Sequence, residues 1–107
     1  MENNLHYYNI DELEKWTETA NNVKNLLKEP QKIDIIVLIN GSAINGYLAT
    51  ENQTFIATQG VTFHACNNAM RANQITKDQL PENVVVVPAG VLDLIDLKAQ
   101  GYAYIKP

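Results

Sequence analysis

The sequence predicts a three-layer α/β/α protein with a mainly parallel, five-stranded sheet. Segments typical of strands and helices alternate along the chain, strand then helix four times, followed by a last strand. Two strand candidates, IDIIVLI at 33–39 and VVVV at 84–87, are apolar without polar alternation, which is typical of parallel strands covered on both faces. Right-handed crossovers then place helices on both sides of the sheet. With 107 residues, we expect one domain that spans residues 1–107.

The first strand and helix are expected before residue 30. Residues 5–10 are strand-like, and Asp11 with Glu14 three residues later has the pattern of a capping box at a helix start. The helix should end near Glu29, because Pro30 disfavours helical geometry in the residue before it. One apolar stripe at helical spacing supports this helix: Leu13, Trp16, Ala20, Val23 and Leu27.

The middle of the chain contains two strands separated by helix. After the buried strand at 33–39, we expect a second helical region over residues 42–59, in one or two pieces, with Thr50 and Gln53 as a capping box. Gly60 is a natural stop for that region. Residues 61–66 are the third strand, whose alternating side chains point to opposite faces.

The last third of the chain repeats the pattern. Asn67 is expected to cap a third helix, and Thr76 with Gln79 predicts one more capped turn. A buried strand at 84–87 and a helix from residue 91 that ends at Gly101 follow. Residues 102–105 form the predicted fifth strand.

Composition excludes several classes of function. Apolar residues make up 46% of the chain and charged residues 19%, with a formal net charge of −4 and no Lys/Arg cluster, so no nucleic-acid partner is expected. The start of the chain lacks a basic segment followed by an apolar core, and the longest apolar run, residues 35–39, is far too short for a bilayer. We therefore expect no membrane partner and place the protein in the cytoplasm.

Cysteine and histidine are scarce. Cys66 is the single cysteine, which excludes an internal disulfide, and His6 and His64 are the only histidines. No protein-only metal site and no cofactor are therefore expected. Asp93 and Asp96 are interpreted as the solvated face of the last helix.

Chemistry is expected where the parallel strands end, because ligands of such sheets bind outside the carboxyl ends of the strands. Residues 9–11, 40–42, 66–68 and 88–90 reach that edge in the predicted fold. Asn40 and Gly41 could offer backbone donors to an anion, although this dipeptide is also a common turn. Gly90 permits close approach of the backbone to a neighbour or a ligand.

Cys66 is the central candidate because it ends the third strand at the start of a predicted helix. Unpaired N–H groups of a first helical turn stabilise an anion such as a thiolate or the terminal sulfur of a persulfide. His64 and Arg71 are nearby candidates for added positive charge, although no acidic partner for His64 is evident along the chain. The alternative interpretation is a buried structural cysteine, since free cysteine is among the most buried residue types.

Three stretches resemble the DsrE/DsrF-like family of small α/β proteins, which includes sulfur-relay subunits of the TusD type. They are LINGSA at 38–43, GVTFHACNNAMRANQI at 60–75, and the tail from residue 84 to 107. The resemblance implies a DsrEFH-like fold and a persulfide on Cys66, flanked by Asn67 and Asn68. It also implies a homo-oligomer, a dimer, trimer or hexamer.

Two hypotheses follow. In the first, the protein is a sulfur carrier or sulfurtransferase-like protein that holds a persulfide on Cys66 and exchanges sulfur with a donor or acceptor protein. In the second, it is a non-catalytic oligomeric domain that binds a small ligand or a partner, and the cysteine is structural. An oligomer is expected in either case, because the chain has many large aromatic side chains for a small core: Tyr7, Tyr8, Trp16, Tyr47, Tyr102 and Tyr104.

Overall fold

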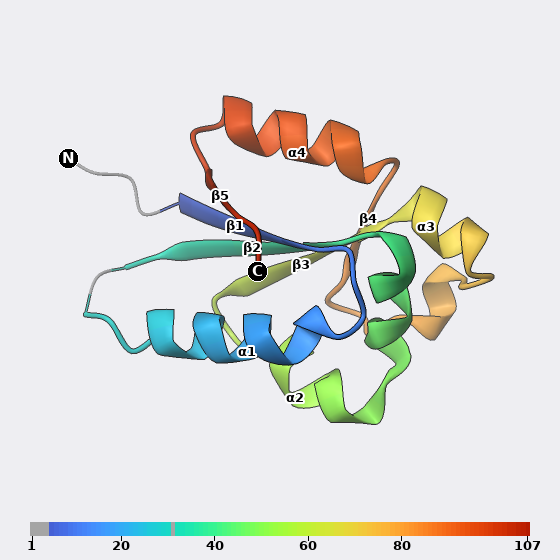
Figure 1. Ribbon diagram of the computed structural model, residues 1–107, viewed down its shortest axis with the longest axis horizontal. Coiled ribbons are helices and arrows are strands. Elements are labelled where there is room, and N and C mark those ends of the chain that lie inside the picture. The colour runs from blue at the N-terminus through green and yellow to red at the C-terminus, as the bar shows by residue number, and fades with distance from the viewer. Residues whose placement is uncertain (1–4, 31) are drawn as a thin grey trace.

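The computed structural model describes residues 5–30 and 32–107. The first four residues of the N-terminal segment, in which no signal peptide is expected, lie outside the described residues. Its centre is a five-stranded sheet in the order β4-β3-β2-β1-β5, parallel at every pairing (Figure 1). The predicted parallel sheet is therefore confirmed. The strands are β1 (Leu5–Ile10), β2 (Asp34–Ile39), β3 (Val61–Cys66), β4 (Val85–Val87) and β5 (Ala103–Ile105).

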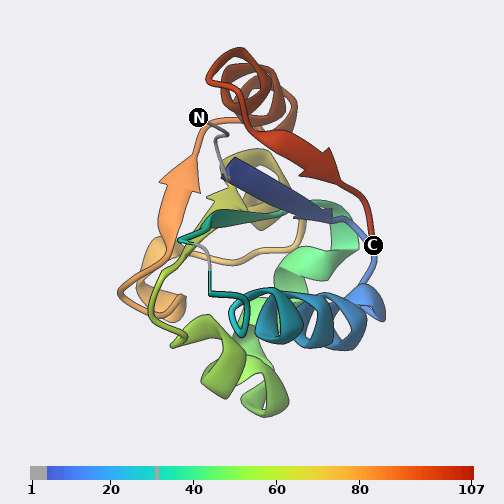
Figure 2. The same ribbon diagram turned by 90° about the vertical axis from the view of Figure 1, so that its left-hand side faces the viewer.

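Helices cover both faces of the sheet, which confirms the three layers. The steps from β1 to β4 all move in one direction across the sheet, whereas the step from β4 to β5 returns across it. Because such crossovers are right-handed, the last helix must lie on the opposite face from the earlier ones. Figures 1 and 2 show α4 on one face and α1 and α2 on the other. The helices are α1 (Lys15–Leu26), α2 (Gln53–Ile56), α3 (Asn67–Ala72) and α4 (Gly90–Ala99), with 3-10 segments η1 (Gly41–Leu48), η2 (Thr50–Asn52) and η3 (Lys77–Gln79).

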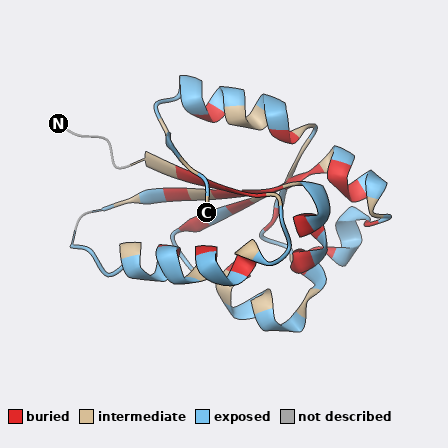
Figure 3. Cartoon of the chain, viewed as in Figure 1, coloured by how far each residue is buried: buried red, intermediate tan, exposed pale blue. Residues whose placement is uncertain are grey.

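The main hydrophobic core lies between the sheet and the helices on the face that α1 covers. Ile10 and Phe63 of the strands are completely buried there, as the red inner segments of Figure 3 illustrate. The Trp16 ring packs edge-on against Tyr47 at a centroid distance of 5.2 Å, and its indole N–H donates to the Ala43 carbonyl at 2.8 Å. This satisfied indole joins α1 to η1, the segment that leaves the carboxyl end of β2.

Helix α1 begins later than the sequence predicts. Its N-cap is Glu14, and no side chain caps the helix, so the capping box expected from Asp11 is wrong. Asp11 instead forms an ion pair with Lys106 near the other end of the chain. Leu13, expected on the buried stripe, is 48% exposed because it precedes the helix in a turn. A long-range ion pair thus replaces the local cap.

The expected second helical region, residues 42–59, is mostly 3-10 helix with a single α-turn at its end. Within this region, Gly46 is packed so tightly against Trp16 that a Cβ there would lie 2.0 Å from the indole nitrogen. The expected capping box of Thr50 and Gln53 is also wrong. The Gln53 amide donates to the carbonyls of residues 47 and 49, so it closes the 3-10 segment rather than capping a helix.

Two details of the last third also differ from expectation. The four-valine strand is not buried on both faces: β4 is an edge strand paired only with β3, and Val85 is 47% exposed. Helix α3 begins at Asn67 with Cys66 as its N-cap, so Asn67 is the first helical residue rather than the cap. The capping box of Thr76 and Gln79 is confirmed.

No helix of the described segments is both long enough and apolar enough to cross a bilayer.

Candidate functional site

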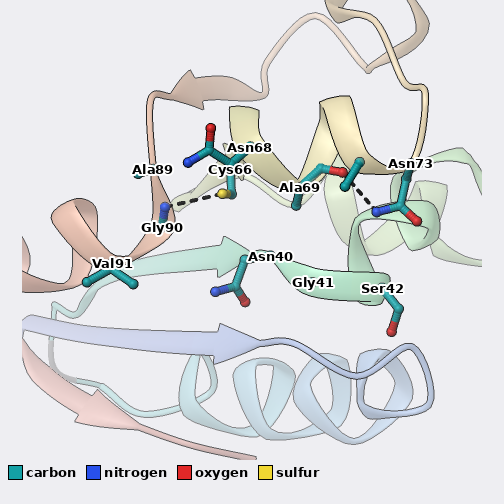
Figure 4. Close-up of a pocket in the computed structure, with 11 residues that line it drawn as sticks. Asn40, Gly41, Ser42, Cys66, Asn68, Ala69, Asn73, Ala89, Gly90 and Val91 are labelled. Carbon is teal, nitrogen blue, oxygen red and sulfur yellow. Dashed lines mark hydrogen bonds between the residues drawn. The ribbon is translucent and has the colours of Figure 1, made fainter.

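A cavity of about 610 Å³ opens at the carboxyl edge of the sheet, where the segments after β2, β3 and β4 meet (Figure 4). This is the edge where the parallel-sheet rule places a ligand. No charged side chain lines the cavity among the residues that the structure describes. Its lining consists of Asn40, Gly41, Ser42, Cys66, Asn68, Ala69, Ala72, Asn73, Ala89, Gly90 and Val91.

Cys66 contributes its sulfur to this cavity. The residue ends β3 and is only 6% exposed, so an external reactant reaches the thiol through the cavity rather than across an open surface. The backbone N–H of Gly90 donates to Cys66 Sγ at an N···S distance of 3.2 Å (Figure 4). Gly90 is the first residue of α4, where the N–H groups lack partners within the helix. The sulfur therefore faces a backbone donor.

Gly90 is closely packed, as expected from its place at the strand end. A Cβ at this position would lie 3.1 Å from Asn40 Nδ2 and 3.3 Å from Asn40 Cβ. The start of α4 thus rests directly on the asparagine that follows β2. This approach brings the Gly90 N–H to the sulfur.

Gly41 lines the same cavity from the other side. Its φ is +55°, in the left-handed region, and a Cβ would lie 2.9 Å from the Asp11 carbonyl oxygen. The sharp turn lets η1 start immediately after β2. The turn keeps the backbone of residues 40–42 at the cavity wall.

His64 has an acidic partner that the sequence did not reveal. His64 Nδ1 lies 2.8 Å from Asp93 Oδ2, and the two side chains are only 14% and 10% exposed. The expectation that Asp93 belongs to a solvated helix face is therefore wrong. His64 itself does not line the cavity. The pair instead joins β3 to the first turn of α4, directly beyond the Gly90 that contacts the sulfur.

Tyr47 supports the same strand from the opposite side. Its hydroxyl donates to the His64 carbonyl at 2.8 Å. Burial raises the pKa of Tyr47 well above its ordinary value of 10.0, so the hydroxyl remains a donor. Contacts from η1 and α4 therefore hold the residue two positions before Cys66.

The remaining predicted site residues separate into two groups. Asn68 lines the cavity, whereas Asn67 and Arg71 do not. The Arg71 side chain is exposed, and it forms no ion pair with any residue that the structure describes. Among the residues described, none that lines the cavity beside Cys66 is a cation, contrary to the expectation from spacing along the chain.

Several residues near the site were not among the individually predicted site residues, although some lie in the predicted strand-end segments. Asn9 of β1 is 5% exposed and donates to Asn40 Oδ1 at 3.0 Å. Its position at a strand end was the available signal, but its partner is 31 positions away. The other lining residues that were not predicted individually are small or neutral: Ser42, Ala69, Ala72, Asn73, Ala89 and Val91. Of these, Ser42 and Ala89 lie within the predicted strand-end segments 40–42 and 88–90.

Within residues 5–30 and 32–107, no three His, Cys, Asp or Glu side chains lie close enough together to bind a metal ion jointly.

The fold and the cavity define a parallel α/β protein with a mostly buried cysteine at the carboxyl edge of its sheet. Residues 19–107 match the DsrE/DsrF-like family, and the chain belongs to this family. Among solved structures, the fold is similar to the protein of unknown function MTH1491 from Methanobacterium thermoautotrophicum, with 29% identity, a TM-score of 0.83 and 96% of each chain covered. It is also similar to the ychN protein from E. coli, with 13% identity, a TM-score of 0.75 and all of both chains covered. No curated protein matches the chain.

Proposed function

We propose that this protein is a sulfur carrier that holds a persulfide on Cys66. The Cys66 thiolate attacks the terminal sulfur of a donor persulfide, a new S–S bond forms, and the donor leaves as a thiolate. An acceptor thiolate then attacks the same terminal sulfur, and the bond to Cys66 breaks. Each step exchanges one S–S bond for another, so no external oxidant or reductant is needed.

The contact between the Gly90 N–H and Cys66 Sγ, inside a cavity at the ligand-binding edge, is the observation that carries the proposal. A backbone N–H stabilises an anionic sulfur by donating a hydrogen bond to it. The cavity, about 610 Å³, leaves room for one more sulfur atom and for the approach of a thiol. Membership of the DsrE/DsrF-like family supports a sulfur-relay context.

In this proposal, the residues of the cavity wall act through neutral groups. The Gly90 N–H contacts the sulfur, and Asn40, Gly41 and Asn68 surround the space in which the terminal sulfur would lie. His64 does not line the cavity; its bond to Asp93 helps to hold the start of α4 in place. Arg71 and Asn67 have no part in this scheme, because neither lines the cavity.

Intact-mass measurement after incubation with glutathione persulfide tests the proposal. We expect the wild-type chain to gain the mass of one sulfur atom, to lose it on addition of a thiol acceptor, and the Cys66→Ser variant to gain none. A wild-type chain that takes up no sulfur, or a Cys66→Ser variant that takes up as much, would contradict the proposal.

The second candidate is a non-catalytic domain that binds a small ligand or partner, with a structural cysteine. The burial of Cys66 at 6% exposure favours it. On this reading, Cys66→Ala would lower the free energy of unfolding, and the wild-type protein would take up no sulfur from the persulfide donor. The same mass measurement therefore separates the two candidates.

We also propose that copies of this chain associate through the outer face of α4. Val91, Leu92 and Ile95 on this helix are 66%, 58% and 59% exposed, an unusual apolar surface for an isolated protein. A second copy is the occupant that the family resemblance implies. Tyr104 is the aromatic side chain that fits the expected interface, at 50% exposure, whereas Tyr7, Tyr8, Trp16 and Tyr47 are buried in the chain itself.

Sedimentation velocity tests the association. We expect an oligomer at micromolar concentration and a monomer for Ile95→Asp, with Gln100→Asp just after the same helix as a control that also adds one negative charge. A monomeric wild-type chain would refute the interface.

The sulfur donor or acceptor would be a further protein partner, whose thiol reaches Cys66 through the cavity.

A further inference from the structure

Two asparagines at the carboxyl ends of β1 and β2 form a hydrogen-bonded chain below the cavity. Asn9 Nδ2 donates to the Leu38 carbonyl at 3.4 Å and to Asn40 Oδ1 at 3.0 Å. Asn9 is buried at 5% exposure, whereas Asn40 is partly exposed and lines the cavity. The chain of bonds therefore runs from the interior of the sheet to the cavity wall.

Hydrogen-bond chemistry determines the orientation of both amides. The Leu38 carbonyl can only accept a hydrogen bond, so the atom of Asn9 that faces it must be the nitrogen. That same nitrogen donates to Asn40, so the Asn40 atom beside it must be the oxygen. The interior backbone thus sets which end of the Asn40 amide is turned away from β1.

The end turned away from Asn9 is the Asn40 nitrogen, and it lies on the side of α4. Asn40 Nδ2 is 3.1 Å from the point where a Cβ of Gly90 would lie, and Figure 4 shows this nitrogen on the Val91 side. Gly90 is also the residue whose N–H contacts Cys66 Sγ. The Asn40 amide nitrogen therefore lies beside the glycine whose own backbone N–H contacts the sulfur.

We propose that Asn9 is a positioning residue that holds the amide nitrogen of Asn40 beside Gly90 at the cavity wall, so that the site accepts an anionic sulfur species. This inference rests on the proposed function and specifies its substrate as the anion of a persulfide. Because no charged side chain lines the cavity among the described residues, its polarity depends on such neutral donors. An Asn40 amide turned the other way would present an oxygen and repel the anion.

Alkylation of Cys66 by two reagents of similar shape measures this polarity. Iodoacetate is an anion and iodoacetamide is neutral, so the ratio of their rate constants reports the response to charge, while a change in exposure alters both rates together. The ratio in the urea-unfolded chain provides the reference. In Asn9→Leu, we expect the native ratio to fall about tenfold, equivalent to about 1.4 kcal/mol, because the Asn40 amide is no longer held with its nitrogen available to an anion.

The chain offers a matched control. Asn45 donates to Asn73 Oδ1 at 3.0 Å, the same type and length of amide contact at the cavity rim. Asn73 is also held by its own bond to the Ala69 carbonyl at 2.8 Å, so it keeps its orientation without Asn45. Asn45→Leu should therefore leave the ratio unchanged.

A double variant tests whether Asn9 acts through Asn40. In an Asn40→Leu background, Asn9→Leu should cause no further fall in the ratio, because the amide that it orients is absent. If Asn9→Leu does not fold, Asn40→Leu alone tests the same donor, and its ratio should fall by a similar factor.

An unchanged ratio in Asn9→Leu or in Asn40→Leu would overturn the inference, as would a native Cys66 that neither reagent alkylates. Sulfur loading is measured separately by intact mass. If the alkylation ratio is the same in Asn9→Leu and the wild type while the wild type takes up sulfur normally, only the positioning role is refuted. The expected ratio effect without any loading would refute the sulfur-carrier function and leave a cavity selective for anions.

Discussion

Replacing Gly90 by alanine tests the packing that brings α4 to the sulfur. The added Cβ would lie 3.1 Å from Asn40 Nδ2 and 3.3 Å from Asn40 Cβ, closer than ordinary contacts. Either the Asn40 side chain moves and loses its bond to Asn9, or α4 shifts and the Gly90 N–H leaves Cys66 Sγ. One hydrogen bond is lost in both cases.

The expected magnitude follows from three contributions. The lost hydrogen bond lowers the free energy of unfolding by about 1 kcal/mol, and tight packing around the new methyl group lowers it by about 1 kcal/mol more. The higher helix propensity of alanine offsets up to about 1 kcal/mol. Gly90→Ala should therefore destabilise the protein by about 1 kcal/mol, equivalent to about 4–8 °C in Tm.

Urea denaturation of a double-mutant cycle is the assay. Asn40→Gly removes the Nδ2 and Cβ atoms that the new Cβ meets, so Gly90→Ala should be neutral or stabilising in that background. The two substitutions should then couple by about 1 kcal/mol. If Gly90→Ala lowers the free energy of unfolding equally in both backgrounds, to within about 0.4 kcal/mol, the contact does not limit this position and the reasoning is refuted.

Three further predictions concern the surroundings of the site. Asp93→Asn should lower the free energy of unfolding at neutral pH by about 1 kcal/mol, because it weakens the bond to His64; an equal effect in the exposed Asp96→Asn would contradict this. Burial raises the pKa of Tyr47, so the unfolded chain releases this proton first and stability falls as pH rises above about 10. In Tyr47→Phe, the free energy of unfolding should fall less steeply with pH above about 10. Below pH 10 the variant should be less stable by about 1 kcal/mol, because the hydrogen bond to the His64 carbonyl is lost. If urea denaturation shows the same dependence of stability on alkaline pH in the variant and the wild type, the assignment to Tyr47 is refuted. Gly46→Ala should destabilise by more than about 3 kcal/mol, because its Cβ would lie 2.0 Å from an indole nitrogen; a thermal melt near that of the wild type would contradict it.

The strands were predictable from local pattern. The bounds of β1 and β3 agree with the sequence prediction at both ends, and β2 differs by one residue. Short β-branched segments bounded by Asn, Gly or Pro specify extended backbone locally. The exposure of Val85 was not predictable in the same way, because burial of a strand depends on its place in the sheet.

Helix starts were less predictable because side chains found distant partners. Asp11 had a suitable sequence for a cap, but it pairs with Lys106 across the fold. The region after β2 is mostly 3-10 helix, and its Gly46 packs against the distant Trp16. At Asp11, the long-range ion pair took the place of a local capping preference worth about 1 kcal/mol.

By itself, the sequence determined the parallel α/β fold, the family and the place of Cys66 at the end of a strand. It did so because strand pattern and chain order decide which strand ends share an edge. Only the tertiary structure decided what faces the sulfur: the Gly90 N–H, with Asn40 packed against the same glycine, while Arg71 lies elsewhere. Those neighbours are brought together by the return of α4 across the sheet, and no spacing along the chain encodes a contact between residues 24 positions apart.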